Sequence, residues 1–136
     1  LGYVKELKEL CQTLNIADQV TFTGPIAHGE LPNWYKKADI FVYPSLYENF
    51  GQPILEAAAS GLPIISTPVG VANEIIEDGE TGFLVNDDYQ ELADRITKLE
   101  NNNLRIKMGN ALRERVRKSY GWKGIIDQYM DLYQSL

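Results

Sequence analysis

Cysteine and histidine are almost absent from this sequence of 136 residues, which contains one of each. A single cysteine, Cys11, cannot form a disulfide within the chain, which excludes a disulfide framework and favours a reducing compartment. Cys11 lies on the apolar side of a predicted helix, so we interpret it as a packing residue and not as a nucleophile. The histidine, His28, lies beside Gly29 in a predicted loop; a solvent-exposed residue is the simpler interpretation, and a catalytic base is the alternative.

Long apolar runs and positive charge are also scarce. No stretch approaches the ~18 consecutive apolar residues that a membrane-spanning helix needs. The 13 lysine and arginine residues are outnumbered by 19 aspartate and glutamate residues, which gives a net charge of −6. Because nucleic acids are bound through a positively charged surface, we expect no nucleic-acid partner.

The remaining composition, 44% hydrophobic and 24% charged residues, is typical of a globular protein. The length corresponds to one ordinary domain, which buries roughly 68% of the surface that its unfolded chain exposes. The sequence begins with Leu1 and shows no signal-peptide pattern, so we expect a fragment of a longer protein.

Hydrophobic spacing predicts helices and strands in alternation. Apolar residues three and four positions apart indicate amphipathic helices, and short apolar or β-branched runs between turn residues indicate strands. The predicted helices cover residues 4–14, 31–38, 53–59, 73–77, 89–99, 104–116 and 122–136. The predicted strands cover residues 20–23, 40–43, 63–67 and 83–85.

Finer predictions concern helix ends and aromatic side chains. Gly61 is predicted to end one helix in the left-handed conformation, and Asp88 with Glu91 predicts a capping box at the start of another. Five aromatic residues occur at helical spacing, and we expect them in the core and not as platforms that stack on sugars: Trp34, Tyr35, Trp122, Tyr129 and Tyr133.

Strands that alternate with helices through short loops indicate an α/β fold, here a Rossmann-like, doubly wound parallel sheet. In such sheets ligands bind beyond the carboxyl ends of the strands. Four loops are predicted to lie at that edge, at residues 24–29, 44–52, 67–72 and 86–89.

The loop at residues 44–52 has the features of an anion site. Its glycine, Gly51, lets a ligand approach the backbone closely. The helix that follows leaves its first backbone N–H groups unpaired, and with the helix dipole they favour a phosphate or pyrophosphate. Glu56, one turn into the helix, is placed to accept hydrogen bonds from vicinal hydroxyls such as those of ribose. Glu48, before the helix, is placed to reach a second polar group.

A longer pattern surrounds these residues. Residues 44–63 contain Pro44, Ser45, Glu48, Phe50, Gly51, Pro53, Glu56, Ala57, Ala59, Gly61 and Pro63 at fixed spacing. Outside them lie Val20-x-Phe22-x-Gly24, Gly70-x-x-x-Glu74-Ile75-Ile76, Gly79-x-Thr81-Gly82-Phe83-Leu84-Val85 and a last helix that opens at Tyr120-Gly121-Trp122. Together these motifs resemble the retaining GT-B glycosyltransferases of family 4. The resemblance covers nearly the whole chain in the right order and implies the C-terminal, nucleotide-sugar-binding half of a GT-B fold, truncated at its N-terminus.

The resemblance implies a role for each matching residue. Glu56 corresponds to the carboxylate that binds the nucleotide ribose, and Glu48 to the catalytic carboxylate that faces the donor sugar and its phosphates. We expect both in one pocket beside the turn at Gly51. The other implied donor-binding positions are the backbone N–H groups of Asn49, Phe50, Gly51 and Gln52, the nucleoside-lining Leu55, and the base-contacting Gly24, Pro25 and Ile26.

The implied reaction is transfer of a sugar from a nucleoside-diphosphate sugar with retention of configuration, without a metal or other cofactor. Basic side chains and the helix start would stabilise the leaving-group charge. The implied partners are the nucleotide sugar and a sugar or lipid-linked acceptor, in a cytoplasmic protein. A contact with the inner membrane surface is one interpretation of a basic stretch, and a solvated helix face is the simpler one; the stretch contains Arg105, Lys107, Arg113, Arg115, Arg117 and Lys118.

The sequence also departs from the family. Members often have two adjacent glycines where this chain has Gly70-Val71, so we expect this loop to approach the donor less closely. The family's first two strands, the Arg and Lys that neutralise the pyrophosphate, and the acceptor-binding domain lie outside these 136 residues. A non-catalytic nucleotide-binding module of the same fold is therefore the alternative. A flavodoxin-like receiver is disfavoured, because no acidic cluster or flavin loop follows the first strand.

The missing strands predict a problem in the sheet. In the strand order 3-2-1-4-5-6, residues 20–23 form the third strand and residues 40–43 the fourth, with two strands normally between them. Three outcomes are open: the two strands pair directly, a second chain pairs there, or residues 20–23 detach. We expect direct pairing or pairing with a second chain in preference to an open gap, because an unprotected edge is a template for association. Alone, the fragment is expected to be inactive and to bind donor weakly.

Overall fold

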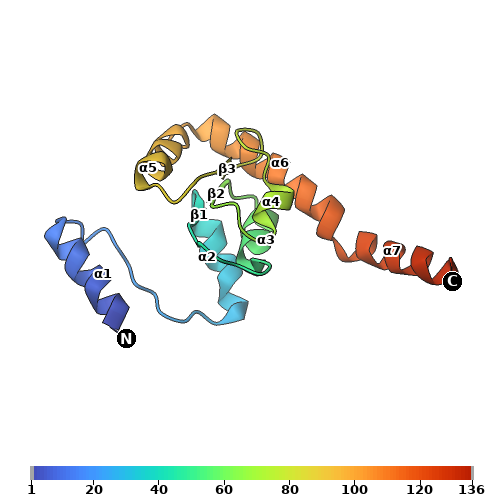
Figure 1. Ribbon diagram of the computed structural model, residues 1–136, viewed down its shortest axis with the longest axis horizontal. Helices are drawn as coiled ribbons and strands as arrows, with labels where there is room; N and C mark the ends of the chain where they lie inside the picture. The colour runs from blue at the N-terminus through green and yellow to red at the C-terminus, as the bar shows by residue number, and fades with distance from the viewer. Residues whose placement is uncertain (1, 136) are drawn as a thin grey trace. The chain divides into compact units, whose positions relative to one another are not determined.

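The computed structural model describes residues 2–135. These residues divide into two compact units, within Leu1–Leu31 and Pro32–Leu136 (Figure 1). The first unit contains helix α1 (Gly2–Thr13) and the short 3₁₀ helix η1 (His28–Glu30). None of its described residues is buried, and the apolar side chains of Val4 and Leu10 are about half exposed, at 47% and 51%.

The predicted strand at residues 20–23 does not form. Between Val20 and Ile26 the described chain makes no backbone–backbone hydrogen bond and has no regular structure. The β-branched and aromatic alternation alone does not stabilise a strand, because a strand needs a neighbour for its N–H and C=O groups. Phe22 instead lies under Lys8, whose ammonium nitrogen is 5.6 Å from the centre of the ring.

The second unit contains a three-stranded sheet in the order β1-β2-β3. Its strands are β1 (Phe41–Tyr43), β2 (Ile64–Ser66) and β3 (Phe83–Leu84), and both pairings are parallel. Three of the four predicted strands are therefore confirmed, with the predicted neighbours. Within this unit β1 is an edge strand, so the predicted direct pairing of residues 40–43 with residues 20–23 is wrong. Pairing with a second chain stays a prediction.

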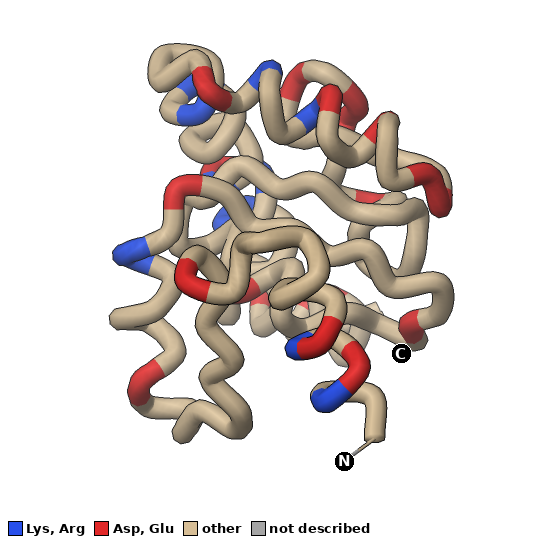
Figure 2. Tube along the Cα trace, turned by 90° about the vertical axis from the view of Figure 1, so that its left-hand side faces the viewer, with Lys and Arg blue, Asp and Glu red and all other residues tan. Residues whose placement is uncertain are grey.

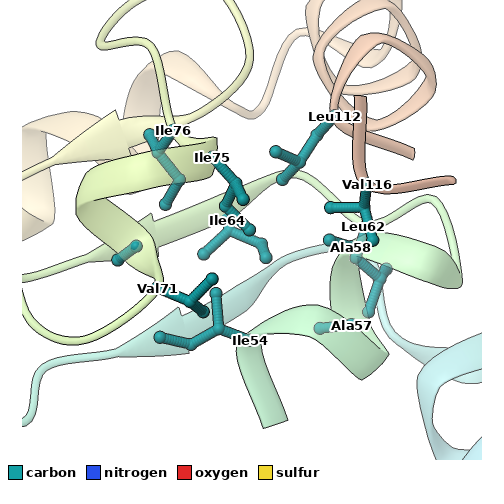
Figure 3. Close-up of a cluster of buried hydrophobic side chains, with 11 residues drawn as sticks. Ile54, Ala57, Ala58, Leu62, Ile64, Val71, Ile75, Ile76, Leu112 and Val116 are labelled. Atoms are coloured by element: carbon teal, nitrogen blue, oxygen red, sulfur yellow. The ribbon is translucent and has the colours of Figure 1, made fainter. Parts of the chain in front are cut away.

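Helices cover both faces of this sheet, as the doubly wound fold requires. The helices of the second unit are α2 (Leu31–Lys37), α3 (Gln52–Ala59), α4 (Ala72–Ile75), α5 (Tyr89–Lys98), α6 (Asn102–Tyr120) and α7 (Trp122–Gln134). Ile64 packs with Ile54 of α3, Ile75 of α4 and Leu112 of α6 (Figure 3). Its neighbour Ile65 points to the opposite face, where it packs with Leu99. Side chains alternate across a strand, so β2 is buried on both sides and holds the two layers together.

The residues at the helix ends have the predicted conformation and hydrogen bonds, with one exception. Gly61, just after α3, has φ of +84°, the left-handed conformation expected there. Asp88 caps α5 by accepting hydrogen bonds from the N–H groups of Gln90 and Glu91. Glu91 does not complete the capping box, because its carboxylate accepts from the backbone N–H of Asn86 at 2.9 Å.

The aromatic residues are less buried than predicted. Tyr35 packs against the core, but the other four side chains are exposed, from about half for Trp34, at 46%, to most of the side chain for Trp122, at 80%. Three of the five, Trp122, Tyr129 and Tyr133, lie on α7, a helix without buried residues that continues beyond α6 (Figure 1). Helical spacing shows which side of a helix is apolar, but not whether another element covers that side.

The contact between α6 and the end of α3 gives a stability prediction. A Cβ atom on Gly109 would lie 2.0 Å from the carbonyl oxygen of Gly61, a backbone atom that cannot rotate away. Gly109→Ala should therefore lower the free energy of unfolding by about 1–3 kcal/mol, although alanine favours a helix. Asn110→Ala, at the exposed neighbouring position, is the control and should be neutral or stabilising in urea denaturation. Equal stability of Gly109→Ala and the wild type would contradict this packing.

Candidate functional site

The loop between β1 and α3 turns sharply at Gly51. Gly51 has φ of +84° and is the N-cap of α3, and its carbonyl accepts the N–H of Ile54 at 2.9 Å. A Cβ at this position would lie 2.9 Å from Cδ1 of Ile54 and 3.4 Å from Cγ of Glu48. The backbone angle therefore favours glycine, and a larger residue would also displace the end of the Ile54 side chain.

The carboxyl end of β2 anchors this loop. The Thr67 hydroxyl donates a hydrogen bond to the Ser45 carbonyl, and the Val71 N–H donates to the Phe50 carbonyl at 2.7 Å. Gly70 lies so close that a Cβ would be 2.5 Å from the same Phe50 oxygen. The Val71 side chain is buried in the core cluster, so the residue in place of the second glycine points into the protein. Whether the loop approaches a donor less closely stays a prediction.

Glu48 accepts two kinds of hydrogen bond. The Tyr43 hydroxyl donates to its Oε2 atom at 2.6 Å, and the Asn49 N–H donates to its Oε1 atom at 2.9 Å. The Tyr43 hydrogen bond is the main cause that holds the pKa of Glu48 below its usual value, and the N–H groups of the loop lower that pKa further. Glu48 is therefore an ionised hydrogen-bond acceptor at neutral pH.

Glu56 has a similar arrangement one turn into α3. The Tyr35 hydroxyl donates to its Oε2 atom at 3.0 Å, and the Gln52 side-chain amide approaches its Oε1 atom at 3.4 Å. Burial and, after it, the contact with Glu56 raise the pKa of Tyr35 to about 12. The Tyr35 hydroxyl therefore keeps its proton, and remains a donor, throughout the physiological pH range.

A row of three aromatic rings connects the two carboxylates. The Tyr35 and Phe41 rings meet edge to face with centres 5.9 Å apart, and the Phe41 and Tyr43 rings stack with centres 6.0 Å apart. Phe41 and Tyr43 are two positions apart on β1, so their side chains share one face of the sheet. Glu48 and Glu56 are thus held on the same side of the sheet, at the two ends of this row.

The other residues predicted for the site are distributed as follows. Asn49 and Gln52 are exposed, Phe50 is half exposed, and Leu55 is partly buried against the core cluster. The Asn49 side chain accepts a hydrogen bond from the Tyr47 hydroxyl at 3.0 Å. Gly24, Pro25 and Ile26 belong to the first unit, so their contact with a nucleotide base stays a prediction.

Residues 1–119 match the family model "Glycosyl transferases group 1". The chain belongs to this family. A curated relative, the lipopolysaccharide core biosynthesis mannosyltransferase LpsB of Rhizobium meliloti, is 34% identical over 114 residues, which cover 82% of this chain and 32% of the relative.

Solved structures of glycosyltransferases agree with this assignment. The C-terminal domain of the group 1 glycosyltransferase LpcC of Francisella tularensis is 37% identical with a TM-score of 0.83, over 90% of this chain and 64% of that one. HepE of Anabaena, solved in complex with UDP and glucose, is 29% identical with a TM-score of 0.87, over 99% of this chain and 37% of that one. The fold is therefore that of the C-terminal domain of a GT-B glycosyltransferase. The chain spans about a third of the length of LpsB.

The sequence analysis does not predict two further candidates for the functional site of this group 1 glycosyltransferase chain, the hydroxyl groups of Tyr35 and Tyr43. Tyr35 was expected only as a core aromatic, and Tyr43 only as part of an apolar strand. A buried tyrosine needs a hydrogen-bond partner for its hydroxyl, and this need could have pointed to nearby carboxylates. Among residues 2–135 no three His, Cys, Asp or Glu side chains gather where they could hold a metal ion; the absence of a metal requirement stays a prediction.

The contact between Gly70 and Phe50 gives a test of the loop anchor. Gly70→Ala should displace Phe50 and so shift the backbone amide NMR signals of Asn49 and Gly51, because the new Cβ meets the Phe50 carbonyl. Gly79→Ala is the matched control, since Gly79 also has positive φ, +81°, but open space around it. Both variants should lose about 1–2 kcal/mol of stability through backbone strain. Unchanged loop signals in Gly70→Ala would contradict the anchor.

Proposed function

We propose that this chain is the donor-binding part of a retaining, family 4 glycosyltransferase, which transfers a sugar from a nucleoside-diphosphate sugar to an acceptor. The observation that carries the proposal is the pair Glu48 and Glu56, held on one side of the sheet on either side of the left-handed turn at Gly51. This loop follows the carboxyl end of a parallel strand, where ligands of such sheets bind.

Each part of the loop has a chemical task in this proposal. Glu56 accepts hydrogen bonds from the two ribose hydroxyls, and its partner Tyr35 occupies only one oxygen. Glu48 faces the donor sugar and is the catalytic carboxylate. The backbone N–H groups of Asn49 to Gln52 bind sugar hydroxyls and the pyrophosphate, because the helix start places partial positive charge there.

The leaving nucleoside diphosphate carries negative charge that must be stabilised. Acidic side chains outnumber basic ones in this chain, and Figure 2 marks both along the trace. We therefore propose that N–H groups of the loop supply part of this stabilisation without a metal, and that an Arg and Lys pair of the intact protein supplies the rest. The solved complexes of HepE with UDP and glucose support a nucleotide-sugar donor for this fold.

The acceptor and the membrane contact belong to the same proposal. We propose a sugar or lipid-linked acceptor bound by another part of an intact cytoplasmic protein. None of the helices in residues 2–135 is long and apolar enough to cross a membrane. In α6, Arg105 and Arg115 pair with Asp39 and Glu77. Contact with a membrane surface is therefore proposed for the exposed basic residues that remain on this helix: Lys107, Arg113, Arg117 and Lys118.

Substitution of the two carboxylates in the intact protein tests the proposal. Glu56→Ala should weaken donor binding about 10- to 150-fold, because a hydrogen bond to a charged group contributes about 1.5–3 kcal/mol. Glu48→Ala should lower turnover more than donor affinity, since this carboxylate faces the reacting sugar. Calorimetric titration and release of nucleoside diphosphate, with a panel of UDP-, GDP- and ADP-sugars, measure the two effects.

The control is Glu114→Ala, an exposed position on α6, which should change neither quantity. If Glu56→Ala leaves donor affinity unchanged while Glu48→Ala abolishes binding, the two roles are reversed. Donor binding without transfer in the intact protein would instead support the non-catalytic nucleotide-binding module.

A further inference from the structure

Glu48 and Glu56, the two carboxylates of the proposed donor site, each accept a hydrogen bond from a tyrosine that lies on another helix or strand. Tyr43 ends β1, and its Oη atom lies 2.6 Å from Oε2 of Glu48. Tyr35 lies on α2, and its Oη atom lies 3.0 Å from Oε2 of Glu56. In both pairs the tyrosine contacts Oε2, while Oε1 accepts from the Asn49 N–H in Glu48 and from the Gln52 amide in Glu56. Each carboxylate oxygen has two lone pairs, so one on each remains for a further donor.

We propose that Tyr35 and Tyr43 are positioning residues of the donor site: each hydroxyl fixes the orientation of one carboxylate, Glu56 and Glu48 respectively, toward the nucleotide sugar. This inference rests on the proposed function. Neither tyrosine belongs to the family motif from which the site was predicted.

The packing of the rings makes this orientation rigid. Tyr35, Phe41 and Tyr43 form one row through ring contacts at 5.9 and 6.0 Å, and all three pack against the main core cluster. A glutamate side chain has three rotatable bonds and, on a loop or helix surface, samples many orientations. A hydrogen bond from a fixed ring restricts these orientations before a ligand arrives, which lowers the entropy cost of binding.

The hydroxyl groups act separately from the rings. Phenylalanine keeps the aromatic row and the apolar packing but removes the donor, so it isolates the hydrogen bond. The Tyr43 hydroxyl also favours the ionised form of Glu48, since its hydrogen bond is the main cause of the lowered pKa of that carboxyl. Without it, Glu48 becomes protonated at a higher pH.

The two tyrosines should therefore affect different kinetic parameters. Tyr43→Phe should lower kcat and move the acidic limb of the pH profile of kcat to higher pH, toward the ordinary pKa of glutamate. Tyr35→Phe should raise the KM for the donor about 3- to 10-fold with little change in kcat, because Glu56 contacts the ribose and not the reacting sugar. In the Glu56→Ala background, Tyr35→Phe should have no further effect on donor binding, because Tyr35 acts only through Glu56.

The experiment follows release of nucleoside diphosphate by the intact protein from whichever donor of the panel turns over fastest, with water as acceptor, from pH 4 to 9. The matched control is Tyr120→Phe, which removes a tyrosine–glutamate hydrogen bond of the same kind, to Glu74 at 2.5 Å, between α6 and α4. It should leave kcat, KM and the pH profile unchanged. Thermal unfolding of all three variants identifies any loss of activity that comes from lost folding.

Two outcomes overturn the positioning role. If Tyr43→Phe keeps the wild-type pH profile and Tyr35→Phe keeps the wild-type KM, the hydroxyls have no role beyond packing. If Tyr120→Phe changes the kinetic parameters as much as the other two variants, the effect is general and not specific to the site. Failure of the proposed function looks different, because Glu48→Ala and Glu56→Ala would then also leave binding and turnover unchanged.

Discussion

The burial of β2 on both faces is the constraint on which the rest of the second unit depends. Ile64 and Ile65 each lie fully inside the protein, in different core clusters, so helices must cover both sides of a sheet of three short strands. A parallel strand reaches its next neighbour only through a crossover helix, which forces each loop that leaves the carboxyl ends of β1 and β2 to turn directly into a helix. The loop of Glu48 is one of these, and the segment after β2 is the other.

The same strand, β2, also connects the core to the loop of the candidate site. Beyond its buried isoleucines, β2 continues into Ser66 and Thr67, whose hydroxyls donate hydrogen bonds to the carbonyls of Tyr43 and Ser45. The next segment fixes Phe50 through the Val71 N–H. The carbonyls of Ser45 and Phe50 are therefore held by Thr67 and Val71, which lie in the segment that follows β2, while side chains of the loop add further hydrogen bonds within it. A rigid scaffold beneath a polar loop is what a preorganised anion site requires.

The parts that could be predicted from the sequence are those set by neighbours along the chain. The apolar run before Pro44, the start of α3 at Gln52 and the left-handed Gly61 each depend on a few adjacent residues, and each is confirmed. The parts that could not be predicted depend on distant partners. Val20–Thr23 has strand-forming residues but pairs with no neighbouring strand. The Glu91 carboxylate accepts the backbone N–H of Asn86, whereas in a capping box it would accept the N–H of Asp88. The hydroxyl of Tyr35 bonds the carboxylate of Glu56, 21 residues further along the chain. This contact depends on how the helices pack, which the spacing of apolar residues does not predict.

Net charge excludes classes of partner but does not decide whether a local anion site exists. The chain carries a net charge of −6, and a nucleoside diphosphate is also negative. At physiological ionic strength, charges farther than about 8 Å away are largely screened, so distant carboxylates contribute little repulsion at the loop. The groups in direct contact decide the interaction, and here they are backbone N–H groups of the loop and the N–H of Gln52, the first residue of α3. Pro53 has no N–H, and the N–H of Ile54 is paired with the Gly51 carbonyl. Glu48 accepts the N–H of Asn49, two residues before the N-cap, at 2.9 Å, so a carboxylate and a backbone N–H of this loop are in direct contact despite the net negative charge.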